Sequence, residues 1–395
     1  MSRWHSYLNS AKEILSLYIG EEPFASFLKK YFSEHKKFGS TDRKQVSHLC
    51  YCYFRLGKAL PNLPTEDRIL TALFFCTTTS NQLLGQIRPG WNDNVTLSVD
   101  EKYKLVSNTF SNADIFPWEK ELAGGINFEQ FCNSFFIQPD LFLRMRPGKE
   151  VLVKEKLLKA DIAFRSMLPS AISIATTVKL DEIIEPDKEA VVQDYSSQRV
   201  AEFIEVVNAE LGRRRQSDGV RVWDCCAASG GKSIMAKDIL GNIELTVSDI
   251  REFILSNLKK RFAVAGIKHY KSFIADLTEP VSILSNNQFD LIVADVPCTG
   301  SGTWSRTPEQ LYYFDENRIE EYCQLQKKII TTIISHLIPG GHLLYITCSV
   351  FKKENEDVID FIKEKFHLEL IKMEILKGYD KKADTMFAAL LKKPL

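Results

Sequence analysis

The sequence predicts an α/β protein in which a helical N-terminal domain and a small α+β linking module precede a doubly wound, mostly parallel sheet. Two patterns support this fold class. Over roughly the first 135 residues, apolar side chains recur at intervals of three and four, which is the period of amphipathic helices. From about residue 195 onward, short apolar segments alternate with helix-like segments, which is typical of a parallel sheet covered by helices.

The change of pattern places two domain boundaries. Residues 1–137 form the predicted helical domain, and 138–194 form the small α+β module. Residues 195–395 form the predicted α/β domain. No internal repeat interrupts this order.

Five segments of the α/β domain have the composition of buried strands: 220–225, 244–249, 271–276, 289–295 and 341–348. Helix-like segments separate most of them. At the end of the chain two more strands, 367–376 and 385–393, follow each other without a full helix between them. We therefore expect one of these two to run antiparallel.

The composition indicates an ordinary globular chain, with 45% hydrophobic and 26% charged residues. Lys plus Arg equals Asp plus Glu at 51 each, so net charge does not point to a nucleic-acid partner. A local basic excess in residues 1–60 and the triplet at 213–215 would suit phosphate contacts, although solvated helix faces explain such runs more often. Without an apolar span or a signal peptide, we expect a cytoplasmic protein that does not contact membranes. Residues 85–98, around Trp91, are predicted to be a surface loop.

Nine cysteines without any C-x-x-C pair indicate neither a disulfide framework nor a zinc site, so no metal is expected. A free cysteine usually behaves as a small buried hydrophobe. We therefore predict reduced, buried thiols at Cys50, Cys52, Cys76, Cys132 and Cys323.

A glycine-containing loop, "DCCAASGGKS" at 224–233, follows the first predicted strand. Gly230 and Gly231 permit a tight turn and close approach of a ligand to the backbone, ahead of a helix N-terminus. A phosphate-binding P-loop would need glycine where Cys226 stands. The G-x-G-x-x-G pattern of nicotinamide and flavin sites is also absent.

Four successive predicted strands end on or next to a carboxylate, namely Asp224, Asp249, Asp276 and Asp295. One such aspartate is more often a cap or turn residue, but four in register would line the edge where open α/β sheets bind ligands. Asp249 is placed to accept hydrogen bonds from a ribose. Since the pyrophosphate loop is missing, the pattern favours S-adenosyl-L-methionine as cofactor.

Cys298 and Cys348 end the fourth and fifth strands, which adjoin in a doubly wound sheet, so both thiols should face one pocket beside the cofactor. A thiolate that adds to carbon 6 of cytosine makes carbon 5 able to accept a methyl group, and Asp295 would hydrogen-bond the ring. A base must then remove the carbon 5 proton. A zinc site and a purely structural pair of thiols are the alternatives, and the residues alone do not decide which thiol attacks.

Four segments together resemble the RNA cytosine-5 methyltransferases of the Sun/Fmu/NOP family over about residues 138–395. They are "VVQDYSSQRV", "CAASGGKS", "ADVPCTGSGTWSRTP" and "LQKKIITTIISHLIPGGHLLYITCSVFKKENEDVI". More weakly, "STDRKQVSHLCYCYFRLGK" is similar to a helix of the NusB-like domain that precedes the catalytic part in bacterial ribosomal-RNA members.

The resemblance implies a Rossmann-like class I methyltransferase domain in which Cys348 attacks the base and Cys298 assists release. Asp249 would bind the ribose, Asp276 would lie near the adenine, and Asp295 would lie near the methyl group and the base. The cofactor loop would consist of Cys226, Ala227, Ala228, Ser229, Gly230, Gly231 and Lys232.

The implied partner is RNA, with ribosomal RNA favoured over transfer RNA, and the implied state is a monomer. A DNA cytosine-5 methyltransferase and a non-catalytic RNA-binding or ribosome-assembly protein on the same scaffold are the alternatives. Two positions depart from the family pattern: Ser229 replaces a proline, and Thr385–Phe387 replace Gly-Phe-Phe.

Overall fold

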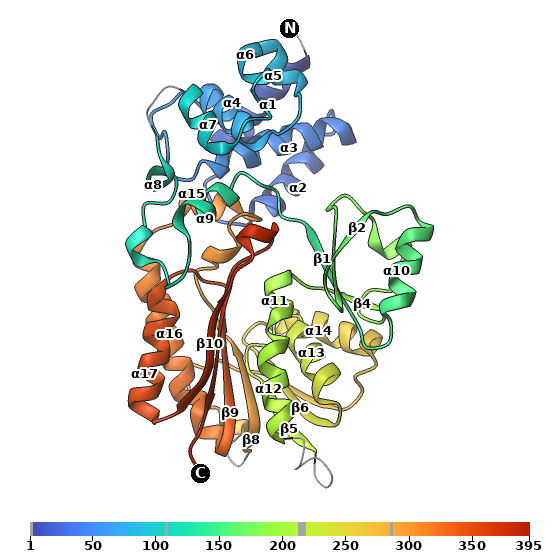
Figure 1. Cartoon of the computed structure of the whole chain (residues 1–395), viewed down its shortest axis with the longest axis vertical. Helices are drawn as coiled ribbons and strands as arrows, with labels where there is room; N and C mark the ends of the chain where they lie inside the picture. The colour runs from blue at the N-terminus through green and yellow to red at the C-terminus, as the bar shows by residue number, and fades with distance from the viewer. Residues whose placement is uncertain (1–2, 107–109, 212–218, 285–286) are drawn as a thin grey trace. The chain divides into compact units, whose positions relative to one another are not determined.

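The computed structural model describes residues 3–106, 110–211, 219–284 and 287–395 (Figure 1). The chain forms two compact units: Met1–Leu122, Asn127–Gln138 and Thr303–Glu316 make up unit 1, and Ala123–Ile126, Pro139–Gly302 and Asn317–Leu395 make up unit 2. The three-part division of the sequence stays a prediction. The structure groups the small module with the large sheet, and it groups Thr303–Glu316 with the helices of unit 1.

Unit 1 is helical, as the periodicity predicts. Its elements are α1 (Arg3–Leu17), α2 (Phe24–Glu34), α3 (Ser40–Arg55), α4 (Thr65–Cys76), α5 (Gln82–Ile87), α6 (Pro89–Asn92), α7 (Val99–Leu105), α8 (Asn112–Ile115), η1 (Glu119–Glu121), α9 (Phe128–Ser134) and α15 (Pro308–Tyr313). The late segment joins this unit through aromatic packing. Trp304 is fully buried, and the Phe314 ring lies 4.7 Å from it and 4.9 Å from Trp118, between centroids.

The prediction of a loop at 85–98 was wrong in its first half, where α5 ends and α6 lies. The Asn81 side chain caps α5 by accepting hydrogen bonds from two backbone N–H groups, and Pro89 starts α6. The Trp91 ring stacks on Phe74 at 5.3 Å between centroids. Turn-forming residues here therefore serve as helix caps.

The small module of unit 2 is a four-stranded antiparallel sheet in the order β2-β3-β1-β4. Its elements are β1 (Leu141–Met145), α10 (Glu150–Lys159), β2 (Phe164–Leu168), β3 (Ala171–Ile174), η2 (Leu180–Glu182) and β4 (Ala190–Val192). Val153 and Leu157 of α10 are buried against Leu143 and Ile172 of the sheet.

The large sheet has seven strands in the order β10-β11-β9-β8-β5-β6-β7. They are β5 (Val220–Asp224), β6 (Ile243–Asp249), β7 (Tyr270–Ile274), β8 (Phe289–Asp295), β9 (Leu337–Thr347), β10 (Glu369–Leu376) and β11 (Met386–Lys392). The first five are parallel to one another, and β11 runs antiparallel between β9 and β10. The predicted doubly wound sheet with one antiparallel strand is confirmed.

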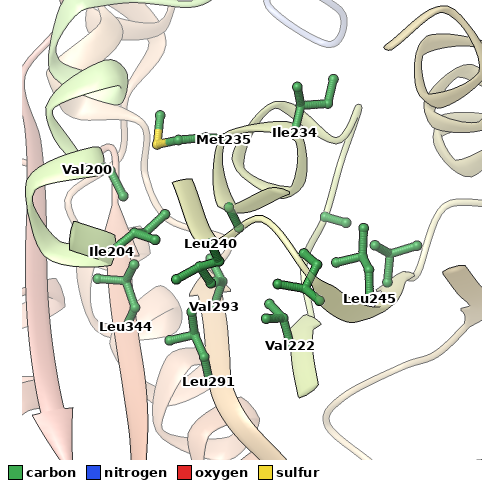
Figure 2. Close-up of a cluster of buried hydrophobic side chains, with 14 of the residues drawn as sticks. Val200, Ile204, Val222, Ile234, Met235, Leu240, Leu245, Leu291, Val293 and Leu344 are labelled. Carbon is green, nitrogen blue, oxygen red and sulfur yellow. The ribbon is translucent and has the colours of Figure 1, made fainter. Parts of the chain in front are cut away.

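Helices cover both faces of this sheet (Figure 1). On one face lie α12 (Ala201–Leu211), α13 (Gly231–Leu240) and α14 (Glu252–Ala265), and on the other lie α16 (Asn317–Ile333) and α17 (Glu356–Phe366). Figure 2 shows part of the first core, where Val222, Leu291 and Leu344 of the strands lie near Ile204 of α12 and Leu240 of α13. The remaining elements of unit 2 are short: α11 (Tyr195–Arg199), η3 (Ser282–Leu284), η4 (Ser301–Thr303), η5 (Ile334–His336), η6 (Lys352–Glu354) and η7 (Tyr379–Lys381).

The backbone of Gly302 lies between the end of β9 and the segment before β11. Its N–H donates to the Cys348 carbonyl at 2.8 Å, and its carbonyl accepts from Thr385 N at 2.9 Å. A Cβ at Gly302 would lie 1.8 Å from the Thr385 carbonyl oxygen. Only glycine fits this crossing, so Gly302 joins three segments of the sheet's carboxyl edge.

We predict that Gly302→Ala lowers the free energy of unfolding by at least about 2 kcal/mol, because backbone must shift to admit the methyl group. Urea denaturation monitored by circular dichroism measures the change. Gly90→Ala in α6 is the matched control, since nothing lies within 4 Å of its added Cβ. Equal midpoints for the two variants would contradict the prediction.

Candidate active site

The predicted acids gather at the carboxyl edge of the large sheet. Asp224, Asp249 and Asp295 are the last residues of β5, β6 and β8, and Asp276 follows the end of β7. Because parallel strands end at the same edge, the first three carboxylates and the loops after them form one site.

The loop from Cys226 to Lys232 crosses the end of β5 in a tight turn. Its backbone is left-handed at Ala228 (φ 45°) and at Gly230 (φ 84°), where α13 begins. At Gly230 a Cβ would lie 2.6 Å from the Phe262 ring, so glycine is required there by conformation and by space. Beside Gly231 an added Cβ would meet nothing within 4 Å, which leaves open space against the backbone.

Ser229, which stands where the family pattern has proline, is held from outside the loop. The Arg261 guanidinium donates to the Ser229 carbonyl at 2.9 Å and lies 2.8 Å from its Oγ. The same guanidinium forms a two-point ion pair with Asp187, at 2.6 and 2.9 Å. A bidentate pair of this kind restrains the arginine strongly. The contacts of Arg261 therefore restrain the loop at the position where a proline would restrict the backbone in the family pattern.

Asp224 is buried, and its Oδ1 has no hydrogen-bond partner among the described residues. Oδ2 accepts from Ser233 Oγ at 2.5 Å. Burial raises the pKa of Asp224 to about 7, and the Ser233 hydrogen bond only partly opposes this rise. The carboxyl edge of the sheet therefore contains a buried carboxyl group with one oxygen that accepts no hydrogen bond within the described part of the chain.

Asp249 accepts hydrogen bonds both from the loop after β5 and from the residue that precedes α14. Its carboxylate accepts from Ala228 N and from the backbone and side chain of Arg251, at 2.9–3.1 Å. Burial alone would raise the pKa of Asp249, but the hydrogen bonds from Arg251 and Ala228 hold it below its usual value. Asp249 is therefore ionised at neutral pH.

Asp276 is not drawn into this group by any described contact. It is exposed, and its carboxylate accepts from Thr278 N at 2.9 Å and from Thr278 Oγ1 at 2.7 Å. These bonds belong to a local turn, which is the common role of an aspartate after a strand. Contact with an adenine stays a prediction.

Lys232 connects the loop after β5 to the end of β8. Its ammonium lies 3.1 Å from Asp295 Oδ2 and donates to Ser197 Oγ at 2.8 Å. Burial would lower the pKa of Lys232, but the negative charge of Asp295 and its hydrogen bond to the ammonium oppose burial, and the pKa is raised. Ser197, in α11, was not identified as a site residue from the sequence, although it lies in the quoted segment "VVQDYSSQRV".

Cys298 and Cys348 come together as predicted. They follow the neighbouring strands β8 and β9, and Cys348 N donates to Cys298 Sγ at 3.3 Å. The pKa of the Cys348 thiol is raised well above its usual value, first by its hydrogen bond with Cys298 and then by burial. Lys232 opposes this rise. Without ligand, Cys348 is therefore a protonated thiol rather than a thiolate.

A buried glutamate connects the two cysteine loops. Glu354 Oε1 accepts from Thr299 Oγ1 and Ser349 Oγ, each at 2.5 Å. Oε2 accepts from Thr299 N at 2.9 Å and from Gln326 Nε2 at 3.0 Å. Thr299 and Ser349 directly follow Cys298 and Cys348, so one carboxylate holds both loops. Burial outweighs these hydrogen bonds and raises the pKa of Glu354.

Asn355 and Gln326 extend this support. Asn355 Oδ1 accepts from Thr347 Oγ1 at 2.6 Å, and its Nδ2 donates to the Ser349 carbonyl at 2.9 Å. Gln326 Nε2 lies 3.0 Å from the carbonyl of Pro297. Sequence reasoning missed Glu354, Asn355 and Gln326 as parts of the site. All three lie in the quoted segment that also contains Cys348, and this position was the signal that could have identified them. They stand at least six residues from Cys348 in the sequence.

The other predictions concern features away from this edge. All nine cysteines are free, and Cys50, Cys52, Cys132 and Cys323 are buried as expected, whereas Cys76 is partly exposed. Within the described ranges, no cluster of His, Cys, Asp and Glu is suited to a metal ion. No helix of the described part is long and apolar enough to cross a membrane. The basic triplet at 213–215 lies outside the described residues.

Sequence comparison connects this site to known proteins. Residues 214–391 match the family model for the 16S rRNA methyltransferase RsmB/F. Ribosomal RNA small subunit methyltransferase B of Klebsiella pneumoniae is 34% identical over 172 residues, which are 42% of this chain and 36% of the relative. The protein of the same name from Photorhabdus laumondii is 29% identical over 248 residues, which are 60% and 54%. The chain thus spans about a third to a half of the length of these relatives.

Structural comparison supports the same architecture. The crystal structure of PH0851 superposes with a TM-score of 0.70 at 18% identity and covers 99% of this chain and 98% of its own. A methyltransferase homologue from Pyrococcus horikoshii has a TM-score of 0.58 at 20% identity over 75% and 100% of the two chains. NSun6 of the same organism, solved with SFG, has a TM-score of 0.57 at 16% identity over 71% and 96%. At such identities these likenesses establish the fold alone, a Rossmann-like sheet covered by helices.

Asp224 generates a prediction about pH. The pKa of Asp224 is about 7 in the folded protein, against 3.8 for an aspartate side chain in water. The folded state therefore binds the carboxyl proton more tightly than the unfolded state does. The stabilisation is complete below about pH 4 and is lost as the pH rises through about 7. Its full size is on the order of 4 kcal/mol. We expect Asp224→Asn to be much less destabilised than the wild type when the pH is raised from 5 to 8.

Urea unfolding at both pH values measures this difference for wild type and variant. Asp276→Asn is the control. Hydrogen bonds from Thr278 lower the pKa of the exposed Asp276 carboxyl, so this group does not titrate between pH 5 and 8. If Asp224→Asn keeps the pH dependence of the wild type, the group is not protonated in the folded protein.

Glu354 generates a second prediction. In Glu354→Gln, an amide N–H₂ would face donors that now point at a carboxylate oxygen, so two hydrogen bonds are lost in the core. We expect the free energy of unfolding to fall by about 2 kcal/mol or more. We also expect faster alkylation of Cys298 by iodoacetamide, because the loops separate.

Glu364→Gln on the exposed side of α17 is the matched control and should change stability by less than about 0.5 kcal/mol. Mass spectrometry of the Cys298 peptide gives the alkylation rate. Loss of stability without faster alkylation would mean that Glu354 supports the core but does not hold the loops together.

Proposed function

Because residues 214–391 match the RsmB/F family model, we propose that the chain belongs to this family of methyltransferases and that it methylates carbon 5 of a cytosine in RNA. The reaction would use S-adenosyl-L-methionine and pass through a covalent bond between Cys348 and the base. The observation that carries the proposal is the pair of thiols at the ends of β8 and β9, with Cys348 N 3.3 Å from Cys298 Sγ.

The residues at the sheet edge fit an adenosine-type cofactor without phosphates. The turn at Ala228 and Gly230 leaves open space beside Gly231, and the buried Asp224 Oδ1 has no partner among the described residues. Asp249 presents an ionised carboxylate at the end of the next strand, where a ribose diol is bound in comparable folds. When bound, S-adenosyl-L-methionine supplies an electrophilic methyl group.

Cys348 would act as the nucleophile. Because its hydrogen bond with Cys298 and burial keep the pKa of Cys348 high, the thiol would first transfer its proton to the Asp295 carboxylate, whose charge also acts on Cys348, while the Lys232 ammonium lowers the pKa of the thiol. The sulfur would then bond to carbon 6 of the cytosine, and the electron pair would move to carbon 5. Asp295, fixed by Lys232, would hydrogen-bond the ring near nitrogen 3.

Cys298 would assist the second half of the reaction. After methyl transfer, a base has to remove the proton from carbon 5, and the electron pair then expels the Cys348 sulfur from carbon 6. Cys298 Sγ already lies within hydrogen-bond range of the Cys348 backbone, so it would be close to the methylated carbon. Removal of this thiol should therefore stop release without stopping attack.

The target base would have to be unpaired or turned out of its helix, because carbon 6 of a stacked cytosine is not accessible to a side chain. Ribosomal RNA is the proposed substrate class, since the matched family model and both curated relatives carry that description. The helical unit 1 would contribute to RNA binding through the basic excess in residues 1–60.

The test is a denaturing gel of Cys298→Ala after incubation with S-adenosyl-L-methionine and unmodified ribosomal RNA. We expect a slowly migrating, RNase-sensitive protein band, because Cys348 attacks and release stalls. The band should disappear in the Cys298→Ala, Cys348→Ala double variant. Cys323→Ala, which removes a buried thiol of α16, is the control and should give no band.

Two other outcomes would contradict parts of the proposal. If no band forms while the wild type transfers methyl groups to RNA, the roles of the two cysteines are wrong. If the wild type transfers nothing to naked RNA or to small ribosomal subunits, the chain is a non-catalytic protein on this scaffold.

A further inference from the structure

The carboxylate proposed to bind ribose is already occupied by the protein's own arginine. Asp249 Oδ1 accepts from Arg251 N at 3.0 Å and from Arg251 Nε at 2.9 Å. Oδ2 accepts from Arg251 Nη2 at 3.1 Å and from Ala228 N at 3.0 Å. Four donors therefore converge on one carboxylate.

A carboxylate offers about four acceptor positions. All are in use at Asp249, so the two hydroxyl groups of a ribose cannot be accepted unless two donors leave. The Ala228 N–H is fixed by the tight turn, and the Arg251 N–H is fixed at the start of α14. Only the Arg251 guanidinium is free to move, because its side chain is 51% exposed, whereas that of Asp249 is 4% exposed.

We propose that Arg251 is a competing internal ligand of the ribose-binding carboxylate, and that its guanidinium has to leave Asp249 before the ribose hydroxyls of the methyl donor can bind. This inference rests on the proposed function, which assigns the ribose to Asp249. The closed arrangement reduces the fraction of molecules that are ready to bind, and the apparent affinity falls by that fraction.

The competition gives opposite signs for stability and affinity. If Arg251 only supports the fold, its removal should lower the free energy of unfolding and weaken cofactor binding together. If Arg251 competes, its removal should still lower stability, because a partly buried ion pair is lost. Cofactor binding should nevertheless become tighter, because two acceptor positions are free.

The experiment compares wild type, Arg251→Ala and Arg221→Ala by calorimetric titration with S-adenosyl-L-methionine and by thermal unfolding. Arg221 is the matched control: it forms a comparable ion pair with Asp290 at 3.2 Å, is 42% exposed, and lies at the beginning of β5. We expect Arg251→Ala to bind about three- to tenfold more tightly at a lower melting temperature. Arg221→Ala should bind like the wild type.

Competition by adenosine and by 2′,3′-dideoxyadenosine then locates the effect. The gain in Arg251→Ala should appear with adenosine and be absent with the analogue that lacks both hydroxyls. An equal gain with both compounds would mean that Arg251 obstructs the site sterically, and the inference would be wrong. Unchanged or weaker binding of S-adenosyl-L-methionine by Arg251→Ala would also overturn it.

Failure of the proposed function has a different signature. In that case the wild type, Arg221→Ala and Arg251→Ala would all fail to bind S-adenosyl-L-methionine, and both proposals would fall. If the wild type binds and only the expected gain is missing, the methyltransferase assignment stands and the role of Arg251 alone is refuted.

Discussion

The parallel pairing of β8 with β9 is the constraint on which the site depends. Asp295 is paired in register with Ile346, so the loops that follow the two strands must leave the sheet side by side. Parallel strands also send both loops to the same edge, which an antiparallel pair joined by a hairpin would not do. The two thiols meet because the sheet fixes where each loop begins. Glu354 then fixes how far the loops separate, through hydrogen bonds to Thr299 and Ser349.

The site consists largely of buried polar groups, and burial and neighbouring groups together shift their pKa values. Asp224 and Glu354 are carboxyl groups whose pKa burial raises, whereas donors keep the pKa of Asp249 low. The Lys232 ammonium lies between Asp295 and Ser197 and counters the rise in the pKa of Cys348. In a region of low dielectric such couplings are strong. The pKa of the Cys348 thiol therefore depends on the whole group of polar residues rather than on one neighbour.

The sheet, its antiparallel strand and the common edge could be predicted because apolar segments alternate with helix-like segments and end on or next to carboxylates, which a parallel topology brings to one edge. The sequence pattern could not predict contacts between side chains far apart in sequence. Glu354 reaches back to Thr299, and Arg261 reaches both Asp187 and Ser229. Asp276 was placed by strand counting, yet the strand ends at Ile274 and the hydrogen bonds of Asp276 stay within its own turn, with Thr278. Trp304 and the segment after it join the helical unit through ring packing, which no local period indicates.

Two carboxylates of the same edge are each paired with a cation of the protein itself. Asp249 is neutralised by Arg251, and Asp295 is neutralised by Lys232. A buried carboxylate without such a partner would be destabilising, so each cation offsets a negative charge that burial would otherwise penalise. These partners differ in their freedom to leave: Lys232 is 9% exposed and held on two sides, while Arg251 is half exposed and held only by Asp249 among the described contacts. In the proposed complex, the side chains at the end of β8 would therefore be held rigidly, whereas Arg251 after β6 would be able to move. Under the two proposals, such a division would let the reacting groups stay in place while Arg251 moves aside for the ligand.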